Sequence, residues 1–578
     1  MNRCTDKRIV VFSDLNIPLR DGVALAATIY SPREVARAPI VFAMTPYTRD
    51  RLHDRGLYFA EAGLIFVAVD VRGRGDSGGT FQPHFHEGDD GHDVTEWLAS
   101  QNFCAGSVAM YGGSYLGYVQ WVAAARFPAH LCTIVPTASP FPGVDVPFRN
   151  NIFAPYMVRW LAMVTGTADR PKMFGDMGSW SAAFSNHHAM GAAFRELDKA
   201  VGFPSDTFQE WLAHPEQGPY WDALNPSRCD YERICLPILT ITGMYDGDQP
   251  GALEHYKQHM RHGSEQARRQ HFLVIGPWDH VGCSNPKQQC EGVDFGKNSV
   301  IDMLQLHRDW YLWTLKGAPK PSFLEKNVAY FVAGADRWRY ADSLEQATGS
   351  VWPLFLHADS NPTDVFRSGQ LLAERVDSRG PAFYRFDPAD ASRAAFEGLS
   401  EEDTLTDQRM LFQSHGQYLV YHTPPLERDT ELSGFFKLTA WISIDQPDTD
   451  IRVAIFEISI DGTSIRLSTD AVRARYREDL RLGKIIETKK PMRYIFDHFT
   501  FVSRLIRKRG RLRLVIGPND SVKRQRNYGS GKAVASETVA DARPVTVRLH
   551  HDAQYASVLE IPLGRADEKE IGDGGQMG

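Results

Sequence analysis

"MYGGSYLGY", residues 110–118, places Ser114 among glycines at the point where one apolar run ends and another begins. The run before it, "SVAMYG" (107–112), has the length and composition of a buried β-strand. The run after it, "YLGYVQWVAAAR" (115–126), is typical of a helix. A serine on such a strand-to-helix turn presents its hydroxyl as a nucleophile elbow does. Gly-Gly-Ser is also ordinary turn chemistry, so the motif alone leaves both interpretations open.

The neighbouring glycines fit an elbow at this position. We expect Gly112 and Gly113 to remove Cβ atoms where the strand and the helix crowd the turn, and Gly117 to let the helix pack closely behind it. The common pattern G-x-S-x-G would place a glycine at 116, where this chain has Leu116. The sequence therefore departs from that pattern by one position.

Around this motif, the first part of the chain alternates short β-rich runs with helical text. Buried strands are predicted at "PIVFAM" (39–44), "LIFVAVDV" (64–71) and "LCTIVP" (131–136). "GDDGHDVTEWLASQ" (88–101) predicts a helix with acidic residues at its start, where the helix dipole favours them. This alternation indicates an α/β fold with a mostly parallel sheet.

The strand-like apolar runs stop near residue 146, and an aromatic-rich sequence typical of helices follows to about residue 232. Strand-like runs return at "PILTITG" (237–243) and "HFLVIGP" (271–277). We therefore expect a helical cap inserted between two strands of the sheet.

After a predicted helix (299–317) and strand (327–334), the pattern changes to alternation at period two. Examples are "GFFKLTAWISI" (434–444) and "DIRVAIFEISIDG" (450–462), with Pro, Gly and Asp at the breaks. The sequence thus predicts an all-β sandwich or jelly roll at the carboxy-terminal end.

These patterns predict five segments. They are a first core part (1–145), a helical cap (146–232), a second core part (233–350), a jelly-roll domain (351–565) and a flexible tail (566–578).

Composition excludes several functional classes. A net charge of −7 over 578 residues leaves no basic footprint for nucleic acid. One basic stretch, "RLIRKRGRLRLVIG" (504–517), is interpreted as the wet face of a half-buried strand. No run of about 18 apolar residues suggests a membrane span, and the amino terminus lacks the apolar core of a signal peptide.

The seven cysteines are scattered and show no paired Cys-x-x-Cys spacing of the kind that binds zinc. Free thiols in a reducing compartment fit best, so we expect a cytoplasmic protein. The cysteines are Cys4, Cys104, Cys132, Cys229, Cys235, Cys283 and Cys290.

A serine nucleophile needs a general base, and the base needs an acid to orient it. In elbow-type enzymes these follow in the order serine, acid, histidine, on loops after strands. "ITGMYDGDQPG" (241–251) offers Asp246 after one predicted strand, and "VIGPWDHVG" (274–282) offers His280 after the next. Turn chemistry would also explain Asp246, and Asp248 and Asp279 are rivals for the acid.

Several motifs together resemble the CocE/NonD hydrolases, the relatives of cocaine esterase, glutaryl acylases, α-amino-acid ester hydrolases and Xaa-Pro dipeptidyl-peptidases. The motifs are "DVRGRGDSGG" (70–79), "GGSYLG" (112–117), "GMYDGD" (243–248), "GPWDH" (276–280) and "TPPLERDTELSG" (423–434). The resemblance covers nearly the whole chain and implies an α/β-hydrolase core, a helical cap and a carboxy-terminal jelly roll. The resemblance also accounts for Leu116, because the nucleophile-elbow motif of this family is G-x-S-Y-x-G, with the second glycine one position later.

The resemblance implies that Ser114 is the nucleophile, His280 the base and Asp246 the acid. It further implies that the backbone N–H of Tyr115 and the hydroxyl of Tyr47, in "VFAMTPYTRD" (41–50), form the oxyanion hole. Without the resemblance, Tyr47 is equally well explained as a loop aromatic that packs on the core.

We therefore predict a serine hydrolase that cleaves a carboxylic ester or amide through an acyl-enzyme, without a metal or an organic cofactor. A peptidase or β-lactam acylase is the alternative within this class, and a non-catalytic binding protein on the same fold is the alternative outside it. The expected partner is a small-molecule substrate, with no nucleic acid or membrane. A homo-oligomer is compatible with the sequence, which does not decide the oligomeric state.

Aromatic residues of the predicted cap suggest an apolar acyl or aryl pocket. Trp160 and Trp211 are the predicted substrate-binding residues, and Trp180 and Trp221 are further candidates. Core packing is the expected role of at least half of these four.

Overall fold

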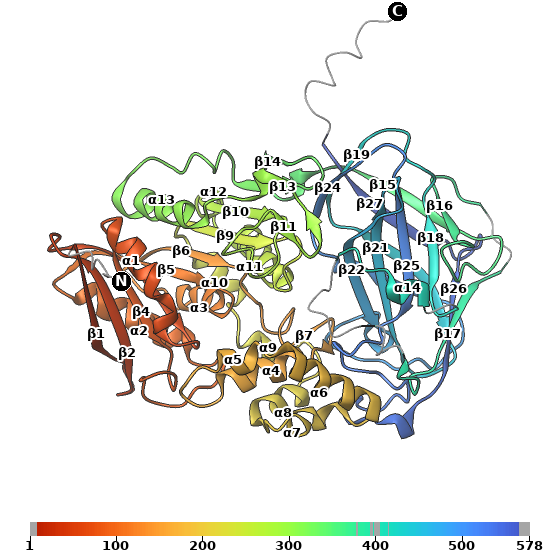
Figure 1. Ribbon diagram of the computed structural model, residues 1–578, viewed down its shortest axis with the longest axis horizontal. Helices are drawn as coiled ribbons and strands as arrows, with labels where there is room; N and C mark the ends of the chain where they lie inside the picture. The colour runs from red at the N-terminus through yellow and green to blue at the C-terminus, as the bar shows by residue number, and fades with distance from the viewer. Residues whose placement is uncertain (1–7, 377–379, 393–396, 398–404, 414–415, 566–578) are drawn as a thin grey trace, which may run out of the picture.

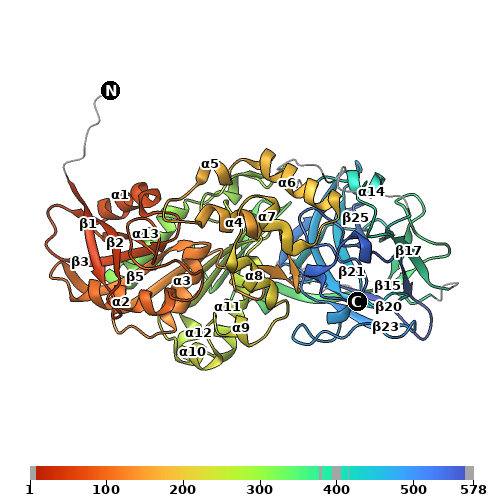
Figure 2. The same ribbon diagram turned by 90° about the horizontal axis from the view of Figure 1, so that it is seen from below.

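The computed structural model describes residues 8–376, 380–392, 397, 405–413 and 416–565. The predicted flexible tail (566–578) and Cys4 lie outside the described residues. Three parts are visible in Figure 1: an α/β core, a helical insertion below it and a β domain at the other end of the molecule. Figure 2, seen from below, shows the insertion running along both the core and the β domain.

The core is built on a ten-stranded sheet with the order β1-β2-β4-β3-β5-β6-β9-β10-β13-β14. Its central strands pair in parallel and are almost wholly buried, because helices cover both faces. The prediction of a mostly parallel α/β sheet is confirmed. The strands are β1 (Ile9–Pro18), β2 (Ala24–Pro32), β3 (Ala38–Thr45), β4 (Ile65–Asp70), β5 (Cys104–Gly113), β6 (Leu131–Thr137), β9 (Ile238–Gly243), β10 (His271–Gly276), β13 (Val328–Val332) and β14 (Arg337–Ala341).

The main helices of the core follow the strands in sequence. They are α1 (His53–Glu61), α2 (Glu87–Ser100), α3 (Tyr115–Ala124), α11 (Gln249–His262), α12 (Glu265–Arg269) and α13 (Met303–Lys316). Every residue of α3 is buried, which explains why its sequence is apolar all round rather than amphipathic.

Between β6 and β9 the chain leaves the sheet and forms the helical insertion, as the absence of strand-like runs in this part of the sequence suggested. It contains a short hairpin, β7 (Phe148–Arg149) and β8 (Ile152–Phe153). Its helices are α4 (Tyr156–Val164), α5 (Pro171–Phe174), α6 (Met177–Met190), α7 (Leu197–Ala200), α8 (Asp206–Ala213), α9 (Pro219–Asp222) and α10 (Arg228–Arg233). The residue numbers at which the predicted segments divide stay predictions.

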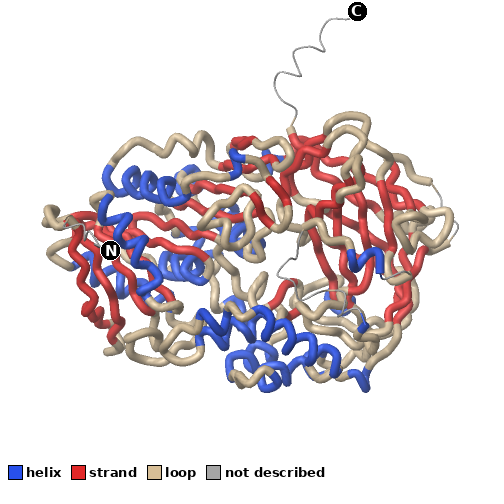
Figure 3. The backbone as a smooth tube through the Cα atoms, viewed as in Figure 1, coloured by secondary structure: helices blue, strands red, loops and turns tan. Residues whose placement is uncertain are grey.

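The carboxy-terminal part is a β domain, whose strands stand out in red in Figure 3. Thirteen strands form one connected sheet with its own buried core. Its finer description as a jelly roll stays a prediction. The strands are β15 (Thr348–His357), β16 (Gly369–Leu372), β17 (Ala382–Phe386), β18 (Leu419–His422), β19 (Thr430–Gly434), β20 (Lys437–Ile444), β21 (Asp450–Ile458), β22 (Ser464–Arg473), β23 (Met492–Phe496), β24 (Val502–Ile506), β25 (Arg511–Pro518), β26 (Val545–His550) and β27 (Val558–Gly564).

The basic stretch 504–517 forms β24 and β25, but its interpretation as a wet face is wrong for two arginines. Arg504 and Arg513 are buried. Arg504 pairs with Glu457, and Arg513 donates to His422 Nε2 at 2.8 Å and to Gln408 Oε1 at 2.9 Å. A buried guanidinium is tolerated where its N–H groups find partners, and sequence alternation alone does not reveal those partners.

Hydrogen bonds tie the β domain to the core and the insertion near the ends of the central strands. Gln249 is fully buried at the start of α11; its amide donates to Phe501 O at 3.1 Å, and its carbonyl accepts from Phe501 N at 2.6 Å. In the insertion, Asn150 donates to Asp470 Oδ1 at 2.7 Å, and Arg473 donates to Asn151 O at 3.1 Å. The β domain therefore helps to fix the loops that surround the carboxyl edge of the sheet.

A chain of hydrogen bonds between buried histidines links α11 to β10. His259 Nε2–H donates to Ile234 O at 3.1 Å, so its Nδ1 accepts from His271 Nδ1–H at 3.0 Å. His271 Nε2 in turn accepts from the Thr240 hydroxyl at 2.8 Å. Each ring is neutral and uses both nitrogens, which leaves no site for an additional proton.

We expect this chain to make the protein sensitive to mild acid. Burial lowers the pKa of His259 and His271, and it lowers that of neighbouring His255 to about 3. Below about pH 6.5 these histidines bind protons in the unfolded state but not in the folded state. Their contribution to the free energy of unfolding is therefore complete above that pH and falls as the pH decreases. Each histidine contributes up to about 1.4 kcal/mol per pH unit. The measurement is the free energy of unfolding from pH 7.5 to pH 5; a flat profile would contradict the prediction.

In the part of the chain that the structure describes, no helix combines the length and apolar character that crossing a bilayer requires.

Candidate active site

Ser114 lies on the turn between β5 and α3 with a strained backbone, φ 59° and ψ −128°. Its N–H donates to Thr137 O on the neighbouring strand at 2.9 Å, and its carbonyl accepts from Gly117 N at 2.8 Å. A conformation of this kind costs about 1–3 kcal/mol in a residue with a Cβ and is held in place by such contacts. Ser114 therefore has the backbone geometry of a nucleophile elbow.

The glycines around Ser114 have the steric role that the sequence suggested. A Cβ on Gly112 would lie 2.5 Å from Leu116 Cβ, and Gly112 also has a positive φ of 137°. A Cβ on Gly117 would lie 2.9 Å from Thr137 O, so α3 packs against β6 only without it. Gly113 is less constrained, because its nearest contact would be at 3.3 Å.

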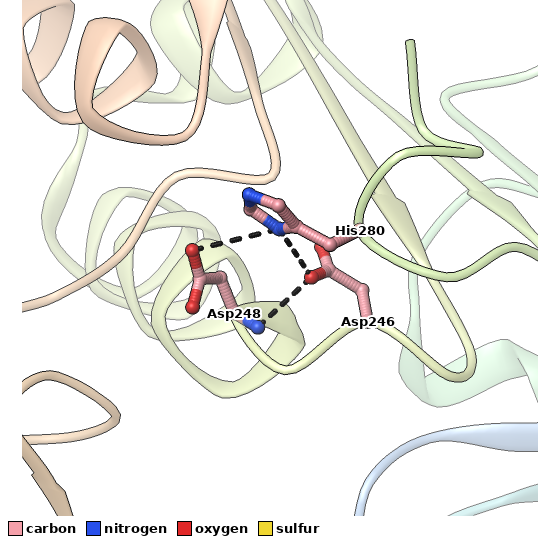
Figure 4. Close-up of side chains that lie close together, drawn as sticks. All are labelled: Asp246, Asp248 and His280. Carbon is pink, nitrogen blue, oxygen red and sulfur yellow. Dashed lines mark hydrogen bonds and ion pairs between the residues drawn. The ribbon is translucent and has the colours of Figure 1, made fainter. Parts of the chain in front are cut away.

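Asp246 and His280 meet at the ends of β9 and β10 (Figure 4). His280 Nδ1–H donates to Asp246 Oδ1 at 2.8 Å, and the Asp246 carboxylate is completely buried. The same oxygen accepts from Asp248 N at 2.9 Å, which fixes the carboxylate within its turn. This bond leaves His280 Nε2 as the nitrogen that can accept a proton.

The rival acids take different positions. Asp248 lies 3.6 Å from His280 Nδ1, beyond hydrogen-bond distance, and lines the pocket beside it. Asp279 accepts from Gly282 N at 2.6 Å and so stabilises the turn that carries His280. Geometry therefore favours Asp246 as the partner of the imidazole.

Carboxylates dominate the electrostatics around His280. Burial disfavours the imidazolium, but the charges of Asp246 and Asp248 outweigh it and raise the pKa of His280 above its usual value. Burial raises the pKa of Asp248 to about 7, a change that His280 opposes and Asp246 reinforces. His280 and Asp248 therefore compete for protons, and a positive charge placed beside Asp248 would free the imidazole to act as a base.

Tyr47 faces the same pocket and interacts with Ser114. Burial raises the pKa of Tyr47 to about 12, so it keeps its proton, while hydrogen bonds from Trp160 and Ser114 act in the opposite direction. The Trp160 indole N–H donates to the Tyr47 hydroxyl at 3.1 Å. Because the Tyr47 oxygen accepts from Trp160, its O–H is free to donate toward the pocket.

The Tyr115 side chain is held from the opposite side. The Tyr115 hydroxyl donates to Glu87 and accepts from His84 N at 3.0 Å. The Tyr115 ring stacks on Trp160 at a centroid distance of 5.7 Å. Burial raises the pKa of Glu87 to about 7. These contacts hold in place the residue whose backbone N–H is the second candidate oxyanion donor.

The pocket that joins these groups has a volume of about 370 Å³. Tyr47, Ser114, Tyr115, Trp160 and His280 all line it, while Asp246 lies behind His280. The lining also includes Asp248, which the sequence named as a rival acid. Lining residues that sequence reasoning missed include His84, Asp145, Arg149 and Arg524.

The four tryptophans of the insertion have different roles. Trp160 lines the pocket, whereas Trp211 is fully buried outside its lining and packs near His84 and Trp221. Trp180 and Trp221 are also buried away from the pocket lining. The placement thus supports substrate contact by Trp160 and core packing by Trp211.

Among the residues that the structure describes, one group has donor atoms close enough for a metal ion: Asp246, Asp248 and His280, within 4.8 Å of one another. Two of these donors already bond to each other as acid and imidazole. The absence of a metal cofactor stays a prediction.

Tyr47→Phe is expected to lower kcat by about 10²- to 10³-fold with KM nearly unchanged, by comparison with single oxyanion-donor deletions. The variant keeps the ring and removes the O–H, which acts only when charge develops on the carbonyl oxygen. Steady-state kinetics on one ester measures the effect. Leu116→Met, which removes no donor, is the control, and normal kcat in Tyr47→Phe would return Tyr47 to a packing role.

Comparison with known proteins shows which family the chain resembles. The family model of the X-Pro dipeptidyl-peptidase (S15 family) matches residues 21–282, and that of the X-Pro dipeptidyl-peptidase C-terminal non-catalytic domain matches residues 324–560. Cocaine esterase of Rhodococcus sp. (strain MB1 Bresler) is 24% identical over 585 residues, covering 96% of this chain and 99% of that protein.

Solved structures show the same fold over almost the whole chain. An α-amino acid ester hydrolase superposes with a TM-score of 0.83 at 20% identity, covering 97% of this chain and 98% of that one. An aminopeptidase from a marine sediment Thaumarchaeota archaeon superposes with a TM-score of 0.82 at 22% identity, covering 96% and 97%. A CocE/NonD family hydrolase from Staphylococcus aureus has a TM-score of 0.70 at 16% identity, covering 96% and 94%. The two family models together match most of the chain, in order, so the chain belongs to the serine hydrolases of the X-Pro dipeptidyl-peptidase (S15) family.

Proposed function

We propose that this hydrolase cleaves a carboxylic ester or amide with Ser114 as nucleophile, His280 as general base and Asp246 as the acid that orients it. The observation that carries the proposal is the placement of a strained Ser114 in one pocket with His280, whose Nδ1–H is bonded to the buried Asp246. Backbone strain of this kind clusters at functional sites, and a serine hydroxyl becomes a nucleophile when a general base lies within reach.

Each group has a defined part in the reaction. His280 Nε2 takes the proton of Ser114 as Oγ attacks the substrate carbonyl, and Asp246 stabilises the imidazolium. The Tyr47 hydroxyl and the Tyr115 N–H bind the oxyanion of the tetrahedral intermediate. His280 then gives the proton to the leaving oxygen or nitrogen as its bond to carbon breaks, which leaves an ester on Ser114. Water, deprotonated by His280, attacks that ester, and the proton returns to Ser114 as the acid leaves.

The pocket further favours a substrate with an ammonium group near the scissile carbonyl. Asp145 and Asp248 line it, and no lysine or arginine forms an ion pair with either in the described part of the chain. Asp145 accepts instead from Phe141 N at 2.8 Å and Gly251 N at 2.5 Å. Burial and the neighbouring Asp248 raise the pKa of Asp145 well above its usual value, and Arg149, which lines the same pocket, interacts electrostatically with Asp145.

Two relatives add support. An α-amino acid ester hydrolase and an aminopeptidase share the fold, and by their names both act on substrates with an α-amino group. We therefore favour α-amino acyl esters or amides. A β-lactam acylase and a simple esterase are the alternatives. We also propose a cytoplasmic location, because the six described cysteines are free thiols.

Labelling with a fluorophosphonate probe tests the proposed function. The wild type should lose its activity and gain one phosphonyl group on Ser114, located by mass spectrometry of the digested protein. An unlabelled wild type would support the binding-protein alternative.

The preference for an ammonium group is tested with the ethyl esters of phenylalanine and of 3-phenylpropionic acid, which differ only in that group. We expect kcat/KM to favour the amino ester by about 10- to 100-fold, the worth of a charged hydrogen bond in a partly enclosed site. Asp145→Asn should reduce this ratio toward unity while the des-amino ester keeps its rate. Equal rates for both esters in the wild type would contradict the assignment.

A further inference from the structure

The proposed reaction gives no role to the motif "DVRGRGDSGG" (70–79), which directly follows the last residues of β4. The motif forms a tight turn, in which Arg74 N donates to Val71 O at 3.0 Å. Gly75 has a positive φ of 54°, and a Cβ on it would lie 2.0 Å from Asp70 Oδ2. The turn therefore requires this glycine, and it carries Arg74 into the protein, where the side chain is fully buried.

The Arg74 guanidinium bonds to backbone carbonyls on two separate segments. Its Nε–H donates to Pro46 O at 2.7 Å, directly before Tyr47 in the chain. Its Nη1 donates to Val164 O at 2.8 Å and to Gly166 O, at the end of α4 and just beyond it. One guanidinium thus joins the segment of Tyr47 to the helix α4.

The other side of Tyr47 is held by Asp70, the first residue of the motif. Asp70 Oδ1 accepts from Arg49 N at 2.7 Å, and Asp70 Oδ2 pairs with the Arg49 guanidinium. Between the two anchors lie Tyr47 and Thr48, and Thr48 has a strained backbone with φ 67°. Such strain persists only where surrounding contacts hold it in place. The motif therefore fixes both ends of a short, strained segment.

The helix α4 also reaches the Tyr47 hydroxyl. Trp160, on α4, donates its indole N–H to that hydroxyl at 3.1 Å. The hydroxyl is thus held by α4, the backbone before it is held by Arg74, and Arg74 holds α4 as well. An oxyanion donor has to lie about 2.7–3.1 Å from the developing charge, so a shift of either segment would misplace it.

The burial of Arg74 is unfavourable for the fold. The two carboxylates that act on it electrostatically, Asp70 and Asp169, form ion pairs with Arg49 and Arg51 instead. Burial lowers the pKa of Arg74, and its Nη2 is enclosed without a partner among the described residues. Residues that break the rules of stable packing in this way are expected where function requires them.

We propose that Arg74 and Asp70 are positioning residues of the oxyanion hole. Arg74 holds the Tyr47 segment against α4, and Asp70 holds the other end of that segment, so the hydroxyl stays aimed at the oxygen on which charge develops. Neither residue lines the catalytic pocket, so both act through Tyr47. The inference rests on the proposed function, because it assumes that the Tyr47 hydroxyl is an oxyanion donor.

Arg74→Lys tests the proposal, because an ammonium keeps the charge but cannot span the carbonyls that the planar guanidinium joins. We expect kcat for one ester to fall by about 10- to 100-fold, the effect of misplacing a catalytic group by about 1 Å, with KM changed less than about threefold. Arg513→Lys is the matched control. Arg513 is a buried arginine of the β domain that bonds to the side chains of His422 and Gln408, so its variant should keep the wild-type kcat.

The double variant with Tyr47→Phe separates positioning from general damage. If Arg74 acts through the Tyr47 hydroxyl, Arg74→Lys should lower kcat by less than about threefold further once that hydroxyl is absent. Losses that multiply, or a wild-type kcat in folded Arg74→Lys, would overturn the proposal. A wild-type kcat in Tyr47→Phe alone would instead refute the oxyanion role of Tyr47, and this proposal with it.

Asp70→Asn decides the matter if thermal melting shows that Arg74→Lys does not fold. The amide has the size of the carboxylate but loses the ion pair with Arg49, so we expect kcat to fall by about three- to tenfold, and not to fall further beside Tyr47→Phe. Glu457→Gln is the control, since it breaks the buried ion pair with Arg504 in the β domain and should keep the wild-type kcat. A wild-type kcat in folded Asp70→Asn would overturn the proposal.

Discussion

Ser114→Ala is expected to lower kcat by about 10⁴- to 10⁶-fold, because it removes the atom that forms the acyl-enzyme. The substitution deletes only a hydroxyl from a turn whose backbone is fixed by Thr137 and Gly117, so the fold should be retained. Ester hydrolysis over long incubations measures the remaining activity, and thermal melting confirms folding. Turnover above a few per cent of the wild-type value would exclude Ser114 as nucleophile.

The double variant Ser114→Ala with His280→Ala sharpens this test. Members of a triad act as a unit, so the second substitution should cost little beyond the first. Two losses that multiply would show that His280 acts independently of Ser114.

Asp246→Asn should have the second largest effect, a loss of about 10⁴ in kcat, because an amide cannot hold the imidazole in the correct tautomer or stabilise its positive form. The geometry behind this expectation is the 2.8 Å bond from His280 Nδ1 to a completely buried carboxylate. Asp279→Asn is the matched control, since Asp279 bonds to the Gly282 N–H of its own turn. A larger loss at Asp279 or Asp248 than at Asp246 would move the acid to that residue.

Asp248→Asn should behave differently from Asp246→Asn in its pH dependence. The Asp248 carboxylate lies 3.6 Å from His280 Nδ1 and helps to raise the pKa of His280. Removal of this negative charge lowers the pKa of the imidazole, so the acidic limb of kcat/KM should move to lower pH.

The fold was largely predictable because buried parallel strands leave continuous apolar runs. The runs at 39–44, 64–71 and 131–136 correspond to β3, β4 and β6. The strands named from the sequence omit β1 and β2, whose pairing is antiparallel at the edge of the sheet. In β1, Val10, Val11 and Phe12 are exposed, so an apolar run there did not signal burial.

The candidate site was predictable as far as its residues follow strands along the chain. Ser114, Asp246 and His280 each come directly after a central strand, and chain order indicated their roles. The supporting contacts were not predictable, because Trp160 reaches Tyr47 across 113 positions and Glu87 reaches Tyr115 from another helix. The family resemblance identified the motifs, but it did not assign Asp145, Asp248 or His84 to the pocket, or exclude Trp211 from its lining.

The pocket is walled by all three parts of the molecule, since Ser114 belongs to the core, Trp160 to the insertion and Arg524 to the β domain. During synthesis Arg524 follows Ser114 by about 410 residues, a delay of about 20 to 80 seconds at ordinary elongation rates. The nascent core can therefore form its elbow long before the pocket has its last wall. A ribosome-bound chain halted before residue 524 would then carry the serine and the histidine in an open groove, and ester cleavage with full selectivity would begin only after the β domain has emerged and docked.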